Sequence, residues 1–277
     1  MSESTPVSAD GFTDALRSVR ESRTLVQHLT NRVTMNDVAQ VTLHWGALPV
    51  MADTPGDAEE MVAAAGAVYL NIGTASPAEV ETMLAVGREA NDRGVPVVLD
   101  PVGAGATPTR RENAERLLST VDFAAIKGNH GEVSALAGVE AEVQGVESIG
   151  EYDEIDETAR ALADSTGATV VASGVTDVVA DGEAAYELTV GHERMGEVVG
   201  TGCVLGATIA AFCGAVVEPI DAALYGTLGF GLAGERAAET DHDGPASYRI
   251  AFLDAVANAS PADVATLDLA GRIERTV

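Results

Sequence analysis

The sequence predicts an α/β protein with a mostly parallel central sheet and helices on both of its faces. Short apolar runs that end in polar, glycine-containing loops alternate with longer segments of helical spacing, which is typical of βαβ units. No linker rich in Pro, Gly or Ser divides the 277 residues, and no repeat of fixed period is visible. We therefore expect a single domain over residues 1–277, with 46% apolar residues to fill its core.

Four apolar runs predict the parallel strands, because strands buried on both faces of a sheet have continuous apolar sequences. They are AVYLNIG (67–73), VPVVLDPVG (95–103), FAAIKGN (123–129) and ATVVASG (168–174). The segments around and between these runs have helical spacing and N-terminal capping residues. The predicted helices are 76–94, 109–120, 131–138 and 151–167.

The pattern changes after the fourth strand. The segment TDVVADGEAAYELTV (176–190) predicts a hairpin that turns at Asp181-Gly182, since an Asp-Gly pair between apolar runs favours a tight turn. From residue 200 onward nearly all of the pattern is helical. The helical segments include 221–239 and 248–258.

One uncharged stretch, 198–217, is long enough to cross a bilayer. It opens with a Gly-Thr-Gly turn, contains four glycines and is flanked by Glu197 and Glu218 rather than by basic anchors. We therefore expect a helix buried in the core of the protein and no membrane span.

The charge balance argues against two classes of partner. Sixteen basic and 43 acidic residues give a net charge of −27, which repels nucleic-acid phosphates and anionic lipid surfaces. Only one basic residue, Lys127, is a lysine. This acidic, arginine-using composition suggests a protein kept soluble in concentrated salt, and we expect its fold to lose stability as salt falls and repulsion is unscreened.

The two cysteines are too far apart to form a disulfide with each other. Cys203 and Cys213 stand ten residues apart in one predicted helix, about 15 Å along its axis, which is too far for a disulfide. The N-terminal residues have no basic stretch followed by an apolar one, so we expect no secretory signal and a cytoplasmic protein.

Polar residues at the ends of the predicted strands are the first candidates for a functional site, because ligands of such sheets bind beyond the carboxyl ends of the strands. Asp100 ends the second strand, and Lys127, Asn129 and Glu132 surround the end of the third. A lone ammonium suits a phosphate, and one or two carboxylates suffice for Mg²⁺ bound together with phosphates. A plain turn at Asp100 and a solvated loop around Lys127 are the alternatives.

The sequence Gly200-Thr201-Gly202-Cys203 predicts an anion hole, because the free N–H groups at the start of the apolar helix point to one spot. Cys203 lies in the first turn, where the field of the helix is expected to lower the pKa of its thiol. Cys203 is therefore a candidate proton acceptor, and a small buried core residue is the alternative.

Three other chemistries lack their patterns. The five histidines have no metal-ligand spacing, so a zinc site is not supported. Ser173 has no G-x-S-x-G context, and the glycines after Asp100 lack the third glycine of a dinucleotide-binding loop.

A series of motifs in the same order resembles the hydroxyethylthiazole kinase family of the ribokinase-like superfamily. The series covers most of the chain, which makes it more specific than any single glycine motif. The motifs are NRVTMNDVAQVTLHWGALPVM (31–51), NIGT (71–74), VPVVLDPVGAGAT (95–107), KGNHGE (127–132), VGTGCVLGATIAAF (199–212) and GPASYRIAFLDAV (244–256).

The resemblance implies a ribokinase-like fold and transfer of the γ-phosphoryl group of ATP, with Mg²⁺, to the hydroxyl of 4-methyl-5-(2-hydroxyethyl)thiazole in thiamine salvage. It also implies a homotrimer with the thiazole site at a subunit boundary. The family usually shows Arg at position 127 and Thr at position 173. By position, the implied roles are thiazole contact for Met51 and Gly200, ATP contact for Lys127 and Ser173, organisation of Mg²⁺ for Asp100 and Glu132, and catalysis for Cys203, which stands where related sugar kinases carry an aspartate.

Three other functions are weighed against this one. A kinase of another small alcohol and a lyase of the same superfamily that repairs hydrated nicotinamide nucleotides would both be expected to carry an aspartate near position 203, where this chain has cysteine. A non-catalytic nucleotide sensor would be expected to lack Asp100, Glu132 or the Gly-Thr-Gly turn, and all three are present.

Overall fold

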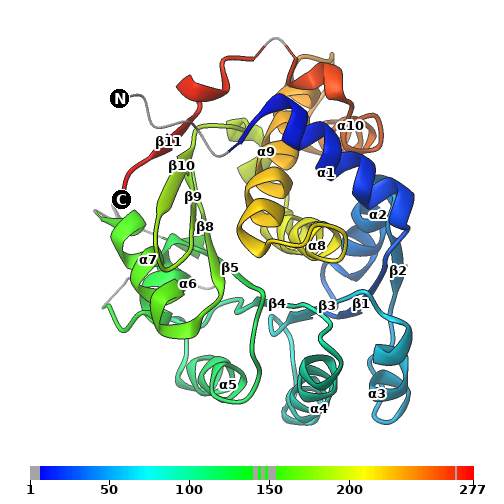
Figure 1. Cartoon of the computed structure of the whole chain (residues 1–277), viewed down its shortest axis with the longest axis vertical. Coiled ribbons are helices and arrows are strands. Elements are labelled where there is room, and N and C mark those ends of the chain that lie inside the picture. The colour runs from blue at the N-terminus through cyan, green and yellow to red at the C-terminus, as the bar shows by residue number, and fades with distance from the viewer. Residues whose placement is uncertain (1–6, 140–142, 145–146, 149–153, 266) are drawn as a thin grey trace.

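A nine-stranded sheet runs through the protein (Figure 1). The computed structural model describes residues 7–139, 143–144, 147–148, 154–265 and 267–277. The sheet order is β11-β10-β9-β8-β5-β4-β3-β1-β2, in which the strands from β2 to β8 are parallel and β9, β10 and β11 are antiparallel additions. The strands of the sheet are β1 (Leu25–Leu29), β2 (Leu48–Val50), β3 (Ala67–Asn71), β4 (Val97–Asp100), β5 (Ala125–Asn129), β8 (Thr169–Ser173), β9 (Asp177–Ala180), β10 (Ala185–Leu188) and β11 (Ile273–Arg275), and a separate pair is β6 (Val143–Gln144) and β7 (Glu147–Ser148).

Helices cover both faces of the sheet. Figure 1 shows α8 across the centre of one face, with α1, α2, α9 and α10 beside it, and α4 and α5 on the other face. The first group is α1 (Ala9–Ser22), α2 (Met35–Trp45), α8 (Thr201–Cys213), α9 (Pro219–Ala238) and α10 (Pro245–Ala257). The second group is α3 (Asp57–Met61), α4 (Pro77–Arg93), α5 (Pro108–Leu118), α6 (His130–Leu136) and α7 (Ile155–Thr166). Four short 3₁₀ segments are η1 (Val62–Ala64), η2 (Glu193–Glu197), η3 (Pro261–Asp263) and η4 (Leu269–Gly271).

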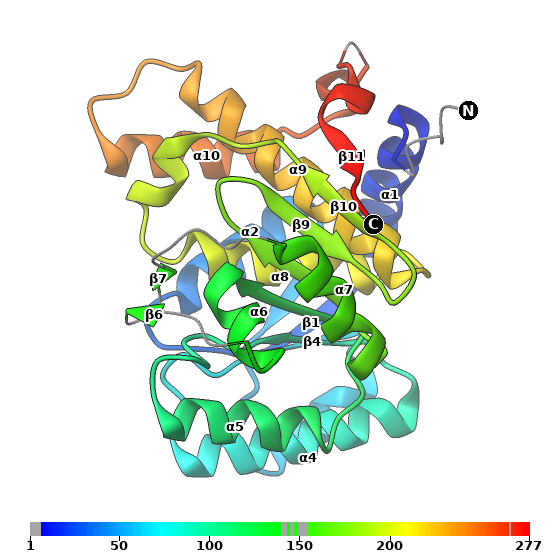
Figure 2. The same ribbon diagram turned by 90° about the vertical axis from the view of Figure 1, so that its left-hand side faces the viewer.

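Two apolar cores follow from the alternation of side chains along the strands. On β4, Val98 packs into the core under α8 and α9, whereas Val97 and Leu99 pack into the core under α4 and α5. Figure 2 shows the sheet from the side, with the antiparallel strands β9 and β10 rising along α9. The sheet therefore holds its strand ends rigidly between two packed layers.

Helix α8 is the buried helix predicted for the uncharged stretch. Every residue from Val204 to Cys213 is buried, and both cysteines are free thiols on this one helix, as predicted. Among the described helices, none is long and apolar enough to cross a membrane.

The predicted strands, helices and hairpin are confirmed to within a few residues, apart from 151–153 of one predicted helix, which lie outside the described residues. Five strands were not predicted: β1, β2 and β11 of the large sheet, and the separate pair β6 and β7. The strands β1 and β2 precede residue 67, where the first predicted strand begins. The strand β11 contradicts the prediction that nearly all of the chain after residue 200 is helical. β11 pairs with β10 at the edge of the sheet and contributes a single buried residue, Ile273, so it carries almost no apolar pattern.

Candidate active site

Five polar side chains and the apolar Met51 form a row along the carboxyl edge of the sheet, one residue on or just after each of six neighbouring strands. Because neighbouring strands are about 4.8 Å apart, the five spacings from β8 to β2 extend over about 24 Å. This length suits two small ligands side by side. In order across the sheet the row is Ser173 (β8), Lys127 (β5), Asp100 (β4), Asn71 (β3), Asn31 (after β1) and Met51 (after β2).

Asp100 is the buried carboxylate at the centre of this row. Its Oδ2 accepts hydrogen bonds from the Tyr69 hydroxyl, at 2.7 Å, and from Asn71 Nδ2, at 2.9 Å. Its Oδ1 is buried and accepts no hydrogen bond from any residue that the structure describes. Burial raises the pKa of the Asp100 carboxyl group, and the positive charge of Lys127 acts against this rise.

Glu132 is held in a different way, because backbone donors occupy both of its carboxylate oxygens. Gly103 N donates to Oε1 at 2.6 Å and Asn129 N donates to Oε2 at 2.8 Å, and the Asn129 side chain accepts from Glu132 N in return. This is a capping box that starts α6 and also ties down the loop after β4. Burial raises the pKa of Glu132 to about 7, against the opposing charge of Lys127.

The Lys127 ammonium lies over the first turn of α8. A Cβ atom on Gly202 would stand only 2.8 Å from Lys127 Nζ, so glycine at this position leaves room for the ammonium. Lys127 forms no ion pair with a carboxylate in the described part of the chain. Burial alone would lower the pKa of Lys127, but the negative charges of Asp100 and Glu132 outweigh this effect and raise it. The cation and the start of α8 therefore face the same point.

The first turn of α8 has the open form predicted for an anion hole. Gly200 precedes the helix with a φ of +89°, a conformation that favours glycine, and no side chain caps the helix start. The Thr201 hydroxyl does not face a ligand, because it donates to Met195 O and Val198 O in the preceding turn, at 2.9 and 2.7 Å. Backbone N–H groups, with a positive helix end, are what this turn offers to an anion.

Cys203 joins the polar network, but the lowered pKa predicted for its thiol is wrong. Its Sγ accepts from Asn31 Nδ2 at 3.3 Å and from Asn71 Nδ2 at 3.2 Å. Burial, followed by the negative charge of Asp100, raises the pKa of Cys203 to about 11. With these two effects the thiol is protonated at neutral pH.

Ser173 and Met51 lie at the two ends of the row. The Ser173 hydroxyl donates to Gly128 O at 3.3 Å, which places it beside β5. Met51 follows β2 and packs, partly buried, against the core that contains α8. No hydrogen bond in the described residues connects either of them to Asp100.

Four residues of this edge were not predicted as site residues. Asn31 and Asn71 stand at strand ends inside the motifs of the sequence, and the rule that led to Asp100 applies equally to them. Arg110 joins two of the loops, because its guanidinium donates to Gly73 O at 3.0 Å and to Val102 O at 3.1 Å. Tyr69 carries no such signal, since a tyrosine inside a strand is ordinary.

A divalent cation finds a suitable but incomplete set of ligands here. No group of three or more His, Cys, Asp or Glu side chains that could hold a metal occurs among the described residues. Asp100 Oδ1 is a buried carboxylate oxygen with no hydrogen-bond partner among the described residues, and Mg²⁺ commonly takes one or two carboxylates and fills its other positions with phosphate oxygens and water. The donors thus fit Mg²⁺ that arrives with a phosphorylated ligand.

Comparison with known proteins gives the family of this chain. The model of the "Hydroxyethylthiazole kinase family" matches residues 16–261. The chain belongs to the hydroxyethylthiazole kinase family. Two relatives named hydroxyethylthiazole kinase, from Haloquadratum walsbyi and Natronomonas pharaonis, are each 52% identical to it over 266 residues, which is 95% of this chain and 92% and 95% of theirs.

Solved structures confirm the predicted ribokinase-like fold of this hydroxyethylthiazole kinase family member. A hydroxyethylthiazole kinase protein from Pyrococcus horikoshii OT3 superposes with a TM-score of 0.87 at 36% identity, covering 97% of this chain and 100% of that one. A ribokinase-like superfamily protein from Enterococcus faecalis superposes with a TM-score of 0.60 at 13% identity, covering 94% and 92%. The second likeness concerns the fold alone.

Proposed function

We propose that this protein transfers the γ-phosphoryl group of ATP to the hydroxyl of 4-methyl-5-(2-hydroxyethyl)thiazole. Family membership supports the reaction. One observation carries the site: the Lys127 ammonium, the Asp100 carboxylate and the uncapped first turn of α8 converge on one point of the sheet edge. Phosphoryl transfer asks mainly for positioning and for neutralisation of charge, and these groups supply both.

The two ends of the row take the two substrates. We assign ATP to the side of Lys127 and Ser173, so that its terminal phosphate meets the N–H groups of Gly200, Thr201 and Gly202. The thiazole then lies on the side of Gly200 and Met51, with its hydroxyl directed at the same point. The spacing of the row, about 24 Å from β8 to β2, is long enough for both substrates.

Asp100 and Glu132 organise Mg²⁺ in this proposal, and Mg²⁺ when bound neutralises phosphate charge. Asp100 offers its Oδ1, which has no hydrogen-bond partner among the described residues, directly. Glu132 acts through the loop after β4 and through the start of α6, because its two oxygens already accept backbone N–H groups. We expect it to support the cation through water.

Cys203 assists the acceptor hydroxyl as a neutral thiol. With a pKa of about 11, it is not a thiolate that removes the proton at neutral pH. The thiol, oriented by Asn31 and Asn71, instead fixes the hydroxyl for in-line attack. As the new O–P bond forms and the bond to ADP breaks, the hydroxyl proton passes to an oxygen of the transferred phosphoryl group. Its contribution is expected to be modest.

We also propose the homotrimer of the family, with the thiazole site at a subunit boundary. Apolar side chains exposed close to the proposed thiazole position support this assignment. Val33 and Val199 are exposed and adjoin Thr34 and Gly200, which touch each other. Such exposed apolar groups are often covered by a partner, and light scattering with size-exclusion chromatography tests for three copies.

The deciding experiment measures ADP release by purified protein with ATP, Mg²⁺ and the thiazole in high potassium chloride. A sample without thiazole and a sample with a pyrimidine alcohol serve as controls. We expect thiazole-dependent ADP release. Release with the pyrimidine alcohol alone would favour the kinase of another alcohol, and no release from folded protein would contradict both kinase functions.

A further inference from the structure

Tyr69 is a fully buried residue of β3 whose hydroxyl contacts Asp100 in the row of site residues. It stands two residues before Asn71 on β3, so both side chains lie on the face of the sheet that α8 covers. Gly206 of α8 makes room for the ring, because a Cβ atom there would stand 2.8 Å from both Cε2 and the hydroxyl oxygen of Tyr69. Glycine at position 206 of α8 therefore leaves space for the Tyr69 ring.

The Tyr69 hydroxyl is the hub of a small network. It has one proton and two acceptors within reach, Asp100 Oδ2 at 2.7 Å and Cys203 O at 3.0 Å. The shorter distance and the negative charge favour the carboxylate. In return the hydroxyl accepts from Asn71 Nδ2 at 2.9 Å, and the same amide also donates to Asp100 Oδ2 at 2.9 Å.

These contacts treat the two oxygens of Asp100 differently. Oδ2 accepts from two side chains, whereas Oδ1 is buried with no hydrogen-bond partner among the residues that the structure describes. A carboxylate rotates easily about its last bond unless it is held. Two donors on one oxygen stop this rotation and fix the direction of the other oxygen.

We propose that Tyr69 is a positioning residue: with Asn71 it anchors Asp100 Oδ2 and so aims Oδ1 at the cation that accompanies the nucleotide phosphates. This inference rests on the proposed function, because it takes Asp100 as the group that meets the cation. Residues that orient a metal-binding side chain in this way typically affect metal affinity by about 10- to 100-fold.

The test is Tyr69→Phe, which removes the hydroxyl and keeps the ring beside Gly206. Binding of Mn²⁺ to the protein with a non-hydrolysable ATP analogue is followed by water-proton relaxation. We expect the dissociation constant of Mn²⁺ to rise about tenfold. In turnover assays the Mg²⁺ concentration for half-maximal rate should rise similarly, while kcat at saturating Mg²⁺ stays within about threefold of the wild type.

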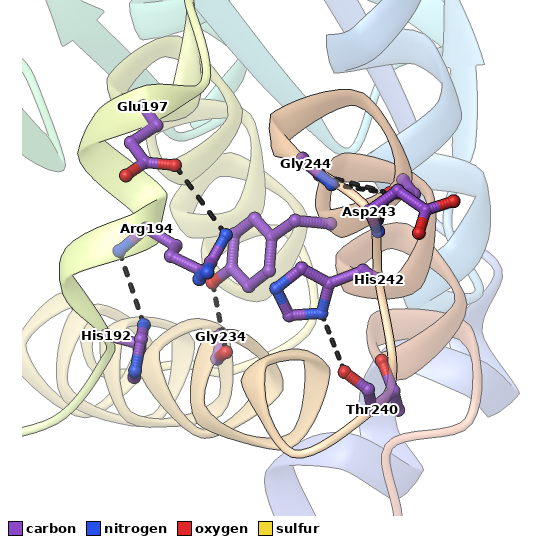
Figure 3. A network of polar contacts seen from close by, with 10 residues as sticks. His192, Arg194, Glu197, Gly234, Thr240, His242, Asp243 and Gly244 are labelled. Carbon is purple, nitrogen blue, oxygen red and sulfur yellow. Dashed lines mark hydrogen bonds and ion pairs between the residues drawn. The ribbon is translucent and has the colours of Figure 1, made fainter.

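Tyr248→Phe is the matched control, since it also deletes one buried hydroxyl. That hydroxyl donates to Gly234 O at 3.0 Å. Its surroundings belong to a separate polar network around His192, Arg194 and His242, drawn in Figure 3. We expect Tyr248→Phe to leave Mn²⁺ binding unchanged, and melting temperatures of both variants measure any loss of stability.

A second variant, Asn71→Ala, removes the other donor to Oδ2 and should weaken Mn²⁺ binding in the same direction. Wild-type Mn²⁺ affinity in Tyr69→Phe would overturn the inference, and so would an equal loss in Tyr248→Phe, which would indicate general loosening. The Mn²⁺ measurement uses no thiazole. A protein that fails to phosphorylate the thiazole but shows the Tyr69→Phe effect would therefore contradict the proposed substrate and support the role of Tyr69.

Discussion

The two ends of α8 each carry a free cysteine, and the surroundings of the two thiols differ: Cys203 is partly buried and Cys213 is buried. Cys203 in the first turn meets the side-chain amides of Asn31 and Asn71 at the carboxyl edge of the sheet. Cys213 at the last turn has no such donors among the described residues and lines a cavity of about 580 Å³ at the opposite edge, together with loops before β3, β4 and β5.

Burial is the main cause that raises both thiol pKa values, to about 11 for Cys203 and about 12 for Cys213. The end of the helix therefore does not decide the charge of its cysteine. What distinguishes the ends is the convergence of charged and polar side chains at one of them, and a cavity without that convergence is weak evidence for a site.

The largest difference between the two edges of the sheet is expected when one carboxylate at each edge is replaced and kcat is measured. Asp100→Asn should lower kcat about 10³-fold, because it removes the charge that faces the cation. Asp122→Asn at the opposite edge should leave kcat unchanged, since Asp122 makes its described hydrogen bonds, to Asn91, through its backbone. Steady-state kinetics of both variants check this, and equal losses would contradict the assignment of the site to one edge.

Two glycines extend the comparison to the helix itself. Gly202→Ala places a Cβ against the flexible end of Lys127, so we expect a folded protein whose kcat/KM for ATP is lowered about 10- to 100-fold. Gly214→Ala meets Thr24 and Ala67 instead, and should cost about 1–3 kcal/mol of unfolding free energy with normal kcat/KM. Denaturant unfolding and kinetics on each variant separate the two results. A normal kcat/KM for ATP in Gly202→Ala would argue against a role of the Lys127 ammonium in binding ATP at the first turn of α8.

The cysteines themselves give a smaller difference. Cys203→Ser should lower kcat about tenfold and leave ATP binding nearly intact, because the thiol orients the acceptor hydroxyl and not the nucleotide. Cys213→Ser should keep kcat and lose about 1–3 kcal/mol of stability, since it buries a hydroxyl in an apolar place. Unchanged kcat in Cys203→Ser would remove any role of the thiol in the reaction.

The sequence predicted four of the six strands that form this sheet edge, β3, β4, β5 and β8, because apolar runs and polar strand ends are local patterns. Asp100 and Lys127 follow from those patterns, and α8 follows from its composition. Tyr69 could not be predicted in the same way, since its role depends on Gly206, 137 positions later in the chain, and on Asp100 across the sheet. The prediction of a lowered pKa for Cys203 was wrong for the same physical reason. The position of Cys203 at a helix start can be inferred from the sequence, whereas its burial and its distance from the charge of Asp100 depend on how the chain packs.

The smallest expected effect is a pH dependence of the unfolding free energy. Its sign tests whether folding raises or lowers the pKa of each thiol. The pKa of Cys213 rises from 9.0 to about 12 on folding, so the unfolded chain releases this proton first as pH rises. The stability due to the protonated thiol is complete below pH 9 and is lost between pH 9 and 12, at up to about 1.4 kcal/mol per pH unit. Cys213→Ala should therefore lose less unfolding free energy than the wild type between pH 8 and 10, measured by urea unfolding.

Cys203→Ala should likewise lose less unfolding free energy than the wild type as pH rises, up to the pKa of about 11 of the wild-type Cys203 thiol. If the helix start lowered the pKa of Cys203 instead, the wild type would gain stability relative to Cys203→Ala as pH rises, because the unfolded thiol would then hold its proton longer than the folded one.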